Sequence, residues 1–138
     1  MKGEAITRDY IRKICDDLGL TSSIDSDGDI RVILRADEDF AHDVYVYFCV
    51  EDKGWFRVMG MAMDFDATQD NLAKYMLAVN NYNRRQKLFK AYLTKEGRVI
   101  IERWELMDED VSEEFIKENC VKISLPGIWD AFKNFWES

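Results

Sequence analysis

The stretch AVNNYNRRQKLFKAYL, residues 78–93, decides the fold, because it runs from the end of a helix directly into a strand. Asparagine tolerates the left-handed backbone conformation that often ends a helix. The cations Arg84, Arg85 and Lys87 suit the negative end of the helix dipole. Residues 88–93 then have the apolar and aromatic composition of a strand. The stretch therefore predicts a helix-to-strand junction.

Strands and hairpin turns are predicted on both sides of this junction. In residues 55–63, every second side chain from Trp55 shares one face and every second side chain from Phe56 shares the other. A strand that is this apolar on both faces is expected at the centre of a sheet. The predicted strands cover 30–35, 43–50, 55–63, 88–93 and 99–106, after a short run before Asp27-Gly28, with turns at 27–28, 51–54 and 95–98.

Two helices are predicted before and after the first strands. Thr7 caps the first helix and Gly19 ends it. The second starts at Asp66 or Thr68 and reaches about Tyr82. Their apolar stripes consist of Tyr10, Ile11, Ile14, Cys15 and Leu18 in the first helix, and of Leu72, Tyr75, Met76 and Val79 in the second.

The C-terminal part is predicted to hold a helix from Ser112, with Phe115, Ile116 and Cys120 pointing inward. Proline and glycine in the stretch 125–127 end or break this helix. An amphipathic segment with a strongly aromatic face follows, and its apolar residues are Ile128, Trp129, Phe132, Phe135 and Trp136. This face either packs on the sheet or forms a partner or dimer surface, and the sequence leaves both open.

These elements predict an α+β domain in the order α-β-β-β(-β)-α-β-β-α. An antiparallel sheet of about five to six strands carries three helices on one side. A chain of 138 residues with 47% hydrophobic residues can build one core, so we expect a single domain over residues 1–138.

The charge balance disfavours nucleic acid and membrane surfaces as partners. The chain has a formal net charge of -8, and both of those partners attract cations. Residues 84–103 nevertheless hold seven Lys/Arg against two Glu. This basic region is either a recognition patch or a set of cations that protect strand edges from aggregation. No apolar run is long enough for a membrane span, and three distant cysteines indicate reduced thiols, so we expect a cytoplasmic protein.

Motifs for catalysis, cofactors and metals are missing from the sequence. Ser23, Asp25, Asp27 and Gly28 match part of a calcium loop, but Leu34 stands where a bidentate glutamate is required. The sequence has a single histidine, His42, and no GxSxG motif that would present a serine nucleophile to it. Cys49 lies within an apolar strand and is expected to be unreactive. We therefore expect neither an enzyme nor a cofactor-binding protein.

Three segments resemble the YbjN-like family, described as putative bacterial sensory transduction regulators. They are the hairpin strand DSDGDIRVIL, the strand WFRVMGMA, and LAVNNYNRRQKLFKAYL with the strand GRVIIERWEL after it. The resemblance spans about residues 7–136 and implies a fold similar to that of type III secretion chaperones. Such chaperones are small, acidic and usually dimeric, and they hold an extended segment of a partner protein.

The resemblance implies no catalytic residues. It places Asn80, Asn83 and Arg84 in the family's asparagine element, where the asparagines either bond local backbone or form a recognition surface. We expect a non-enzymatic regulator or chaperone-like adaptor that binds a protein and forms a possible homodimer. The alternative is a sensor of a small anionic ligand, bound by Arg84, Arg85, Lys87 and Lys90. The candidate partner-binding residues are Trp55, Arg84, Arg85, Phe89, Tyr92, Trp104, Trp129 and Trp136. The aromatic residues among them could equally belong to the core. The candidate structural residues are Asn80, Asn83 and Gly28.

Overall fold

The sheet and helices follow one another in the order that the sequence predicts. The computed structural model describes residues 7–51, 54–107 and 111–137. The elements are α1 (Arg8–Asp17), β1 (Ser22–Ile24), β2 (Ile30–Leu34), β3 (Val44–Val50), β4 (Trp55–Ala62), α2 (Leu72–Arg85), β5 (Lys90–Leu93), β6 (Val99–Leu106), α3 (Glu113–Phe115), the π-helix η2 (Ile116–Lys122) and α4 (Ser124–Lys133). The last three form one continuous helical region, so the α+β prediction with three helices is confirmed.

Six antiparallel strands form one sheet in the order β1-β2-β3-β4-β6-β5. The strand β4 lies inside the sheet between β3 and β6, as its two apolar faces predicted. Gly28 has a φ of 85° in the turn between β1 and β2, a conformation that glycine adopts without steric cost. Both short edge strands, β1 and β5, end the sheet where long edges would invite pairing with other chains.

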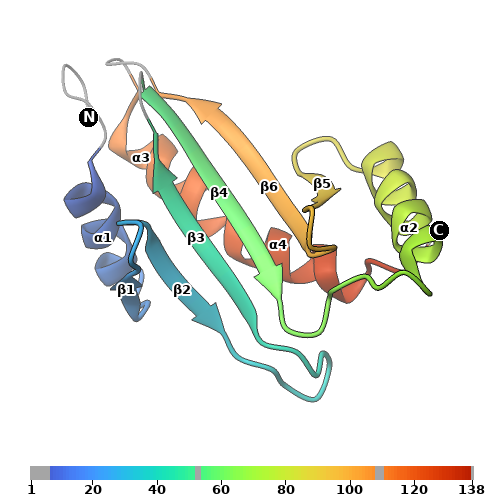
Figure 1. Cartoon of the computed structure of the whole chain (residues 1–138). Coiled ribbons are helices and arrows are strands. Elements are labelled where there is room, and N and C mark those ends of the chain that lie inside the picture. The colour runs from blue at the N-terminus through green and yellow to red at the C-terminus, as the bar shows by residue number, and fades with distance from the viewer. Residues whose placement is uncertain (1–6, 52–53, 108–110, 138) are drawn as a thin grey trace.

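The helices α1 and α4 cover one face of the sheet, and the opposite face carries no helix in the described part of the chain (Figure 1). The core between the layers contains Val46 and Phe48 of β3, Val58 of β4 and Ile101 of β6, all almost fully buried. Gly60 lets α4 approach β4 closely, because an added Cβ would overlap the Ile128 Cγ2 methyl group. The aromatic face of the C-terminal segment therefore packs largely on the sheet: Ile128, Phe132 and Phe135 are fully buried.

The second helix differs from the prediction at both ends and in its buried face. It begins at Leu72 after the N-cap residue Asn71, whose side chain bonds Thr68 N–H. Asp66 instead pairs with Arg98. The helix also continues past Tyr82 to Arg85. Its buried residues are Tyr75, Ala78 and Tyr82, whereas Leu72 and Met76 of the predicted stripe are exposed. The prediction was wrong because α2 packs beside the edge strand β5 and not flat on the sheet, which rotates the buried stripe.

Pro126 does not end the C-terminal helix as the sequence suggested. It lies in the first turn of α4, where a missing backbone N–H leaves no helical bond unmade. The wider π-turns of η2 precede it and end at Lys122, the residue whose carbonyl the proline ring would meet in a continuous α-helix. Ser112 caps α3 as predicted, and Ile116 and Cys120 are buried, but Phe115 is exposed. Among the described helices, none is long and apolar enough to cross a lipid bilayer.

Candidate protein-binding face

The sheet face opposite the helices carries a continuous set of apolar and aromatic side chains. Alternation along each strand, together with the pairing register, places these residues on one surface. We call it the open face, and its members are Ser23, Arg31, Ile33, Tyr45, Tyr47, Cys49, Trp55, Arg57, Met59, Met61, Lys90, Tyr92, Ile100, Glu102, Trp104 and Leu106. Trp55, Trp104 and Leu106 are 41%, 46% and 57% exposed, which is unusual for side chains of this size.

Two tryptophans and an arginine meet on this face at one end of β4 and β6. The rings of Trp55 and Trp104 meet edge to face with centroids 6.1 Å apart. The Arg57 guanidinium carbon lies 5.2 Å from the centroid of the Trp104 ring, a cation–π contact. Arg57 also pairs with Glu51 at 3.4 Å and with Glu102 at 3.6 Å. The cluster is therefore held in place before any partner arrives.

Glu102 extends this cluster across the sheet towards β5. Its Oε1 atom accepts a hydrogen bond from the Trp104 indole N–H at 3.1 Å. Burial raises the pKa of Tyr92, and the nearby Glu102 carboxylate raises it further. The open face thus combines fixed charges with exposed aromatic rings. Its one thiol in the described chain, Cys49, is buried, and burial, above all, raises the pKa of that thiol to about 12.

Asn83 bonds the backbone of the strand that follows its own helix. Its Nδ2 donates to the Ala91 carbonyl at 3.0 Å, and its Oδ1 accepts from the Ala91 N–H at 2.8 Å. These are side-chain-to-backbone bonds of the kind considered for both asparagines. The Asn80 side chain is exposed and makes no hydrogen bond within the described ranges. The two asparagines therefore differ in role despite their proximity in sequence.

The basic stretch at 84–90 is partly committed to helix ends. Arg85 donates to the Asn134 carbonyl at 2.8 Å and also to the Glu137 carbonyl, beyond the end of α4. Lys90 donates to the Gln86 carbonyl at the end of α2 at 3.3 Å. Arg84 and Lys87 are exposed and have no such partner in the part of the chain that the structure describes. Hydrogen bonds to carbonyl oxygens at helix ends therefore account for two of the four cations of the basic stretch.

The remaining candidate residues lie away from the open face. Phe89 is buried against Gly127 of α4. Trp129 is half-buried and lines a shallow groove between α4 and β2. Trp136 is 43% exposed, but its ring packs edge to face on Tyr75 with centroids 4.7 Å apart. Of the eight candidates, the fold brings Trp55, Tyr92 and Trp104 together on one surface.

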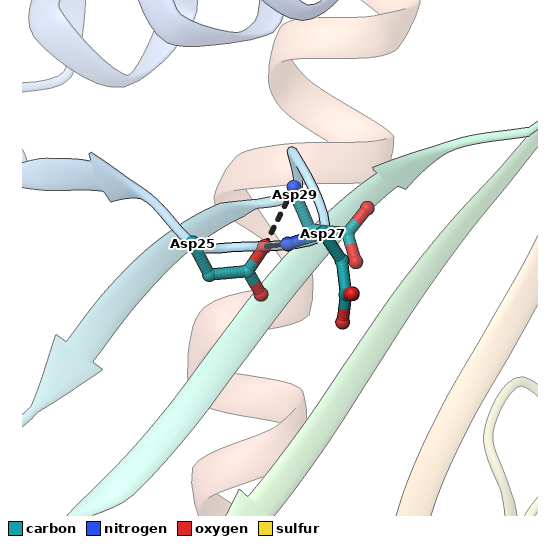
Figure 2. A group of neighbouring side chains, drawn as sticks. All are labelled: Asp25, Asp27 and Asp29. Atoms are coloured by element: carbon teal, nitrogen blue, oxygen red, sulfur yellow. Dashed lines mark hydrogen bonds between the residues drawn. The ribbon is translucent and has the colours of Figure 1, made fainter.

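Three aspartates gather in the turn between β1 and β2 (Figure 2). Asp25, Asp27 and Asp29 can place carboxylate oxygens within 4.8 Å of one another. The hydrogen bonds explain the position of Asp25, since its Oδ1 accepts from the N–H groups of both Asp27 and Asp29 at 2.9 Å. Burial raises the pKa of Asp29, and Asp25 raises it further. The cluster is a turn-forming device, typical of aspartate in tight turns.

His42 and Cys49 are not brought together for catalysis. The His42 ring lies between Phe40 and Phe65, at centroid distances of 5.0 and 5.3 Å, and its Nδ1 is 3.4 Å from Asp64. Cys49 is buried seven residues further along β3. Sequence reasoning did not single out Tyr45, Tyr47, Met59 or Met61 as site residues. Period-two alternation places Met59 and Met61 on the same face of their strand as Trp55, but it does not show which face the helices leave uncovered.

The chain matches known proteins in both sequence and fold. A family model named YbjN, with the description "Putative bacterial sensory transduction regulator", matches residues 7–121. A solved structure, "Crystal structure of YbjN, a putative transcription regulator from E. coli", is 14% identical, with a TM-score of 0.63 and 92% of each chain covered. At this identity the likeness concerns the fold alone. No curated protein matches the chain significantly.

Proposed function

The chain belongs to the YbjN family, and from this premise we propose that it is a non-enzymatic regulator that binds another protein on its open face. The family description, a regulator of sensory transduction, requires that a signal be passed to another molecule. The proposed occupant is an apolar segment of a different protein, held as a chaperone-like adaptor would hold it. The proposal places this event in the bacterial cytoplasm.

The cluster of Trp55, Arg57 and Trp104 is the observation that carries this proposal. Tryptophan and arginine are enriched among the residues that dominate binding energy in protein interfaces. Here they are exposed or half-exposed, in mutual contact and fixed by Glu51 and Glu102. A site that is ordered before binding loses less conformational entropy when the partner docks. Methionines beside such a cluster adapt to irregular apolar surfaces.

The acidity of the chain supports a protein partner and not a nucleic acid. With a net charge of -8 the molecule would repel phosphate backbones over most of its surface. The protein from E. coli is described as "a putative transcription regulator". If this chain also regulates transcription, its negative net charge favours regulation through a bound protein over direct binding to DNA.

A quantitative binding experiment with matched variants tests the proposal. Partners captured from a lysate are identified, purified and titrated against the wild type, Trp104→Ala and Leu77→Ala. Leu77 is the matched control, because it is an apolar residue of α2, 61% exposed and away from the sheet. The affinity should fall about thirtyfold or more in Trp104→Ala, the loss typical of a hot-spot residue, and stay unchanged in Leu77→Ala.

Three outcomes would contradict the proposal. Equal affinities of Trp104→Ala and the wild type would show that the partner does not bind the open face. In light scattering of the protein alone, a dimer that Trp104→Ala dissociates would mean that a second copy of this chain occupies the face. A partner whose affinity depends on Arg84 and Lys87 instead would favour the basic stretch.

A further inference from the structure

A cleft with an unusual set of hydrogen-bond donors lies at the edge of the sheet where β1 meets β2. Its volume is about 500 Å³, and it is lined by Thr21, Ser22, Ser23, Arg31, Ile33 and Arg35. Ser23 lies directly opposite Arg31 in the pairing of the two strands. Arg31 and Ile33 are successive residues on one face of β2, and Arg35 follows the end of the strand. Hydroxyl and guanidinium groups thus converge on one hollow.

Arg31 is the central residue of this cleft because its guanidinium has no partner. Its Nε atom is enclosed and makes no hydrogen bond, and no ion pair joins any of its nitrogens within the described residues. Arg57 and Arg103 also have an unbonded Nε, but their terminal nitrogens pair with Glu102 and Glu105. Among these three enclosed arginines of the described chain, Arg31 alone has no counter-charge. A half-buried cation without one is costly, so it favours the binding of an anion.

The surroundings of Arg31 supply further donors and several carboxylates, none of them paired with it. The hydroxyl groups of Ser23 and Thr21 can donate hydrogen bonds to an oxygen atom in the cleft. Arg35 adds a second guanidinium and pairs with Asp43 through one terminal nitrogen at 3.3 Å. The carboxylates closest to this edge in the strand register are those of Asp43 and of Asp25, Asp27 and Asp29 in the turn between β1 and β2. None of the four comes within ion-pair distance of Arg31 in the described chain.

We propose that this cleft is a binding site for an oxyanion, either a phosphate or a carboxylate group. Arginine presents a planar fork of donors that fits two oxygens of such a group, and the flanking hydroxyls fit a third. The site is distinct from the basic stretch at 84–90, where Arg85 and Lys90 are bonded to carbonyl oxygens. Arg31 and Ile33 lie at the β2 margin of the open face, but anion binding here does not require that a protein occupies that face.

Titrations of the ¹⁵N-labelled full-length protein followed by NMR test this site. Inorganic phosphate is added in one arm and acetate in the other, with chloride adjusted to constant ionic strength. We expect saturable shifts of the Thr21 and Ser23 amides and of the Arg31 Nε–H group. In Arg31→Gln the affinity should be about tenfold or more weaker, and in Arg31→Lys it should lie between the two, because the charge remains but the fork is lost.

Two control variants test whether binding depends on Arg31 in particular, and the two anions identify the class of group that is bound. Arg12→Gln removes one exposed charge of α1 and should bind like the wild type. Arg84→Gln tests the basic stretch and should also leave the affinity unchanged. Saturation by one anion alone identifies that class of group, and saturation by both supports the shared chemistry. The proposal would be overturned by chemical shifts that do not saturate, by equal affinities of Arg31→Gln and Arg12→Gln, or by a loss of affinity confined to Arg84→Gln. The spectrum of Arg31→Gln itself shows whether the variant is folded.

Discussion

At the scale of single residues, Asn83 shows how one amide closes a strand edge. The Thr94 N–H bonds the Arg98 carbonyl, and alternation along an antiparallel ladder then turns the Ala91 backbone groups outward from β6. Asn83 bonds both of these outward groups, as a neighbouring strand would. Its neighbour Asn80 does not contribute to this closure. The sequence does not show which asparagine bonds the Ala91 backbone, because that depends on which side of α2 faces β5.

Replacement of Asn83 should therefore destabilise the folded state, and replacement of Asn80 should not. Asn83→Ala leaves the N–H and carbonyl of Ala91 without their partner, so we expect a loss of about 2 kcal/mol in the free energy of unfolding. Asn80→Ala should change it by less than about 0.5 kcal/mol, since an exposed alanine suits a helix. Urea unfolding of both variants gives the comparison. Equal losses, or a larger loss in Asn80→Ala, would refute the edge-closing role.

At the scale of elements, the contact between β4 and α4 fixes the distance between the two layers. Gly60 faces Ile128, and both residues are buried. The alternation of 55–63 predicted which residues of β4 share a face and that the strand is central, because that pattern is local, but it did not predict which face the helices cover. The extent of the helices was less predictable. The start of α2 at Leu72 and the π-turns of η2 depend on contacts with distant segments and on Pro126, and not on helix propensity.

Gly60→Ala should test this contact. The added methyl group would overlap the Ile128 side chain, so we expect a loss of about 1–3 kcal/mol in the free energy of unfolding from overpacking. A double-mutant cycle with Ile128→Ala provides the control, because removal of the facing side chain should relieve the strain. Strict additivity of the two losses would mean that the close approach of α4 does not constrain residue 60.

At the scale of the whole molecule, one face of the sheet is covered and the other is available. The element order, the antiparallel pairing and the central place of β4 could be predicted, since each rests on patterns within a few residues. The candidate site could be predicted only in part: Trp55, Tyr92 and Trp104 share the open face, whereas Phe89 is buried and Arg85 is bonded at the end of α4. Sequence composition cannot separate an aromatic residue in the core from one on a face that no helix covers.

The buried thiols should make the fold sensitive to alkaline pH. Burial is the main cause that raises the pKa of Cys15 and Cys120 to about 11 and that of Cys49 to about 12, from an ordinary value of 9.0. The thiols stay protonated in the folded state but ionise in the unfolded state above about pH 9. The contribution of the thiols to the free energy of unfolding should therefore be constant below that pH and fall as the pH rises towards the folded pKa values.

Urea unfolding at pH 7.5, 9 and 10 measures this effect. A variant with alanine at all three cysteine positions is the control, and its free energy of unfolding should vary less over the same range, even if it is lower throughout. A wild-type free energy that stays level up to pH 10, or an equal decline in both proteins, would show that the thiols are not the cause.

The central claim is that a protein partner occupies the open face, and photo-crosslinking in living cells tests it most directly. A photo-reactive amino acid replaces Trp104 in one variant and Leu77 of α2 in another, and both are irradiated under the same conditions. We expect a discrete crosslinked product with a different protein from position 104 and none from position 77. A product from position 77 alone, or a product from position 104 that contains only a second copy of this chain, would contradict the claim.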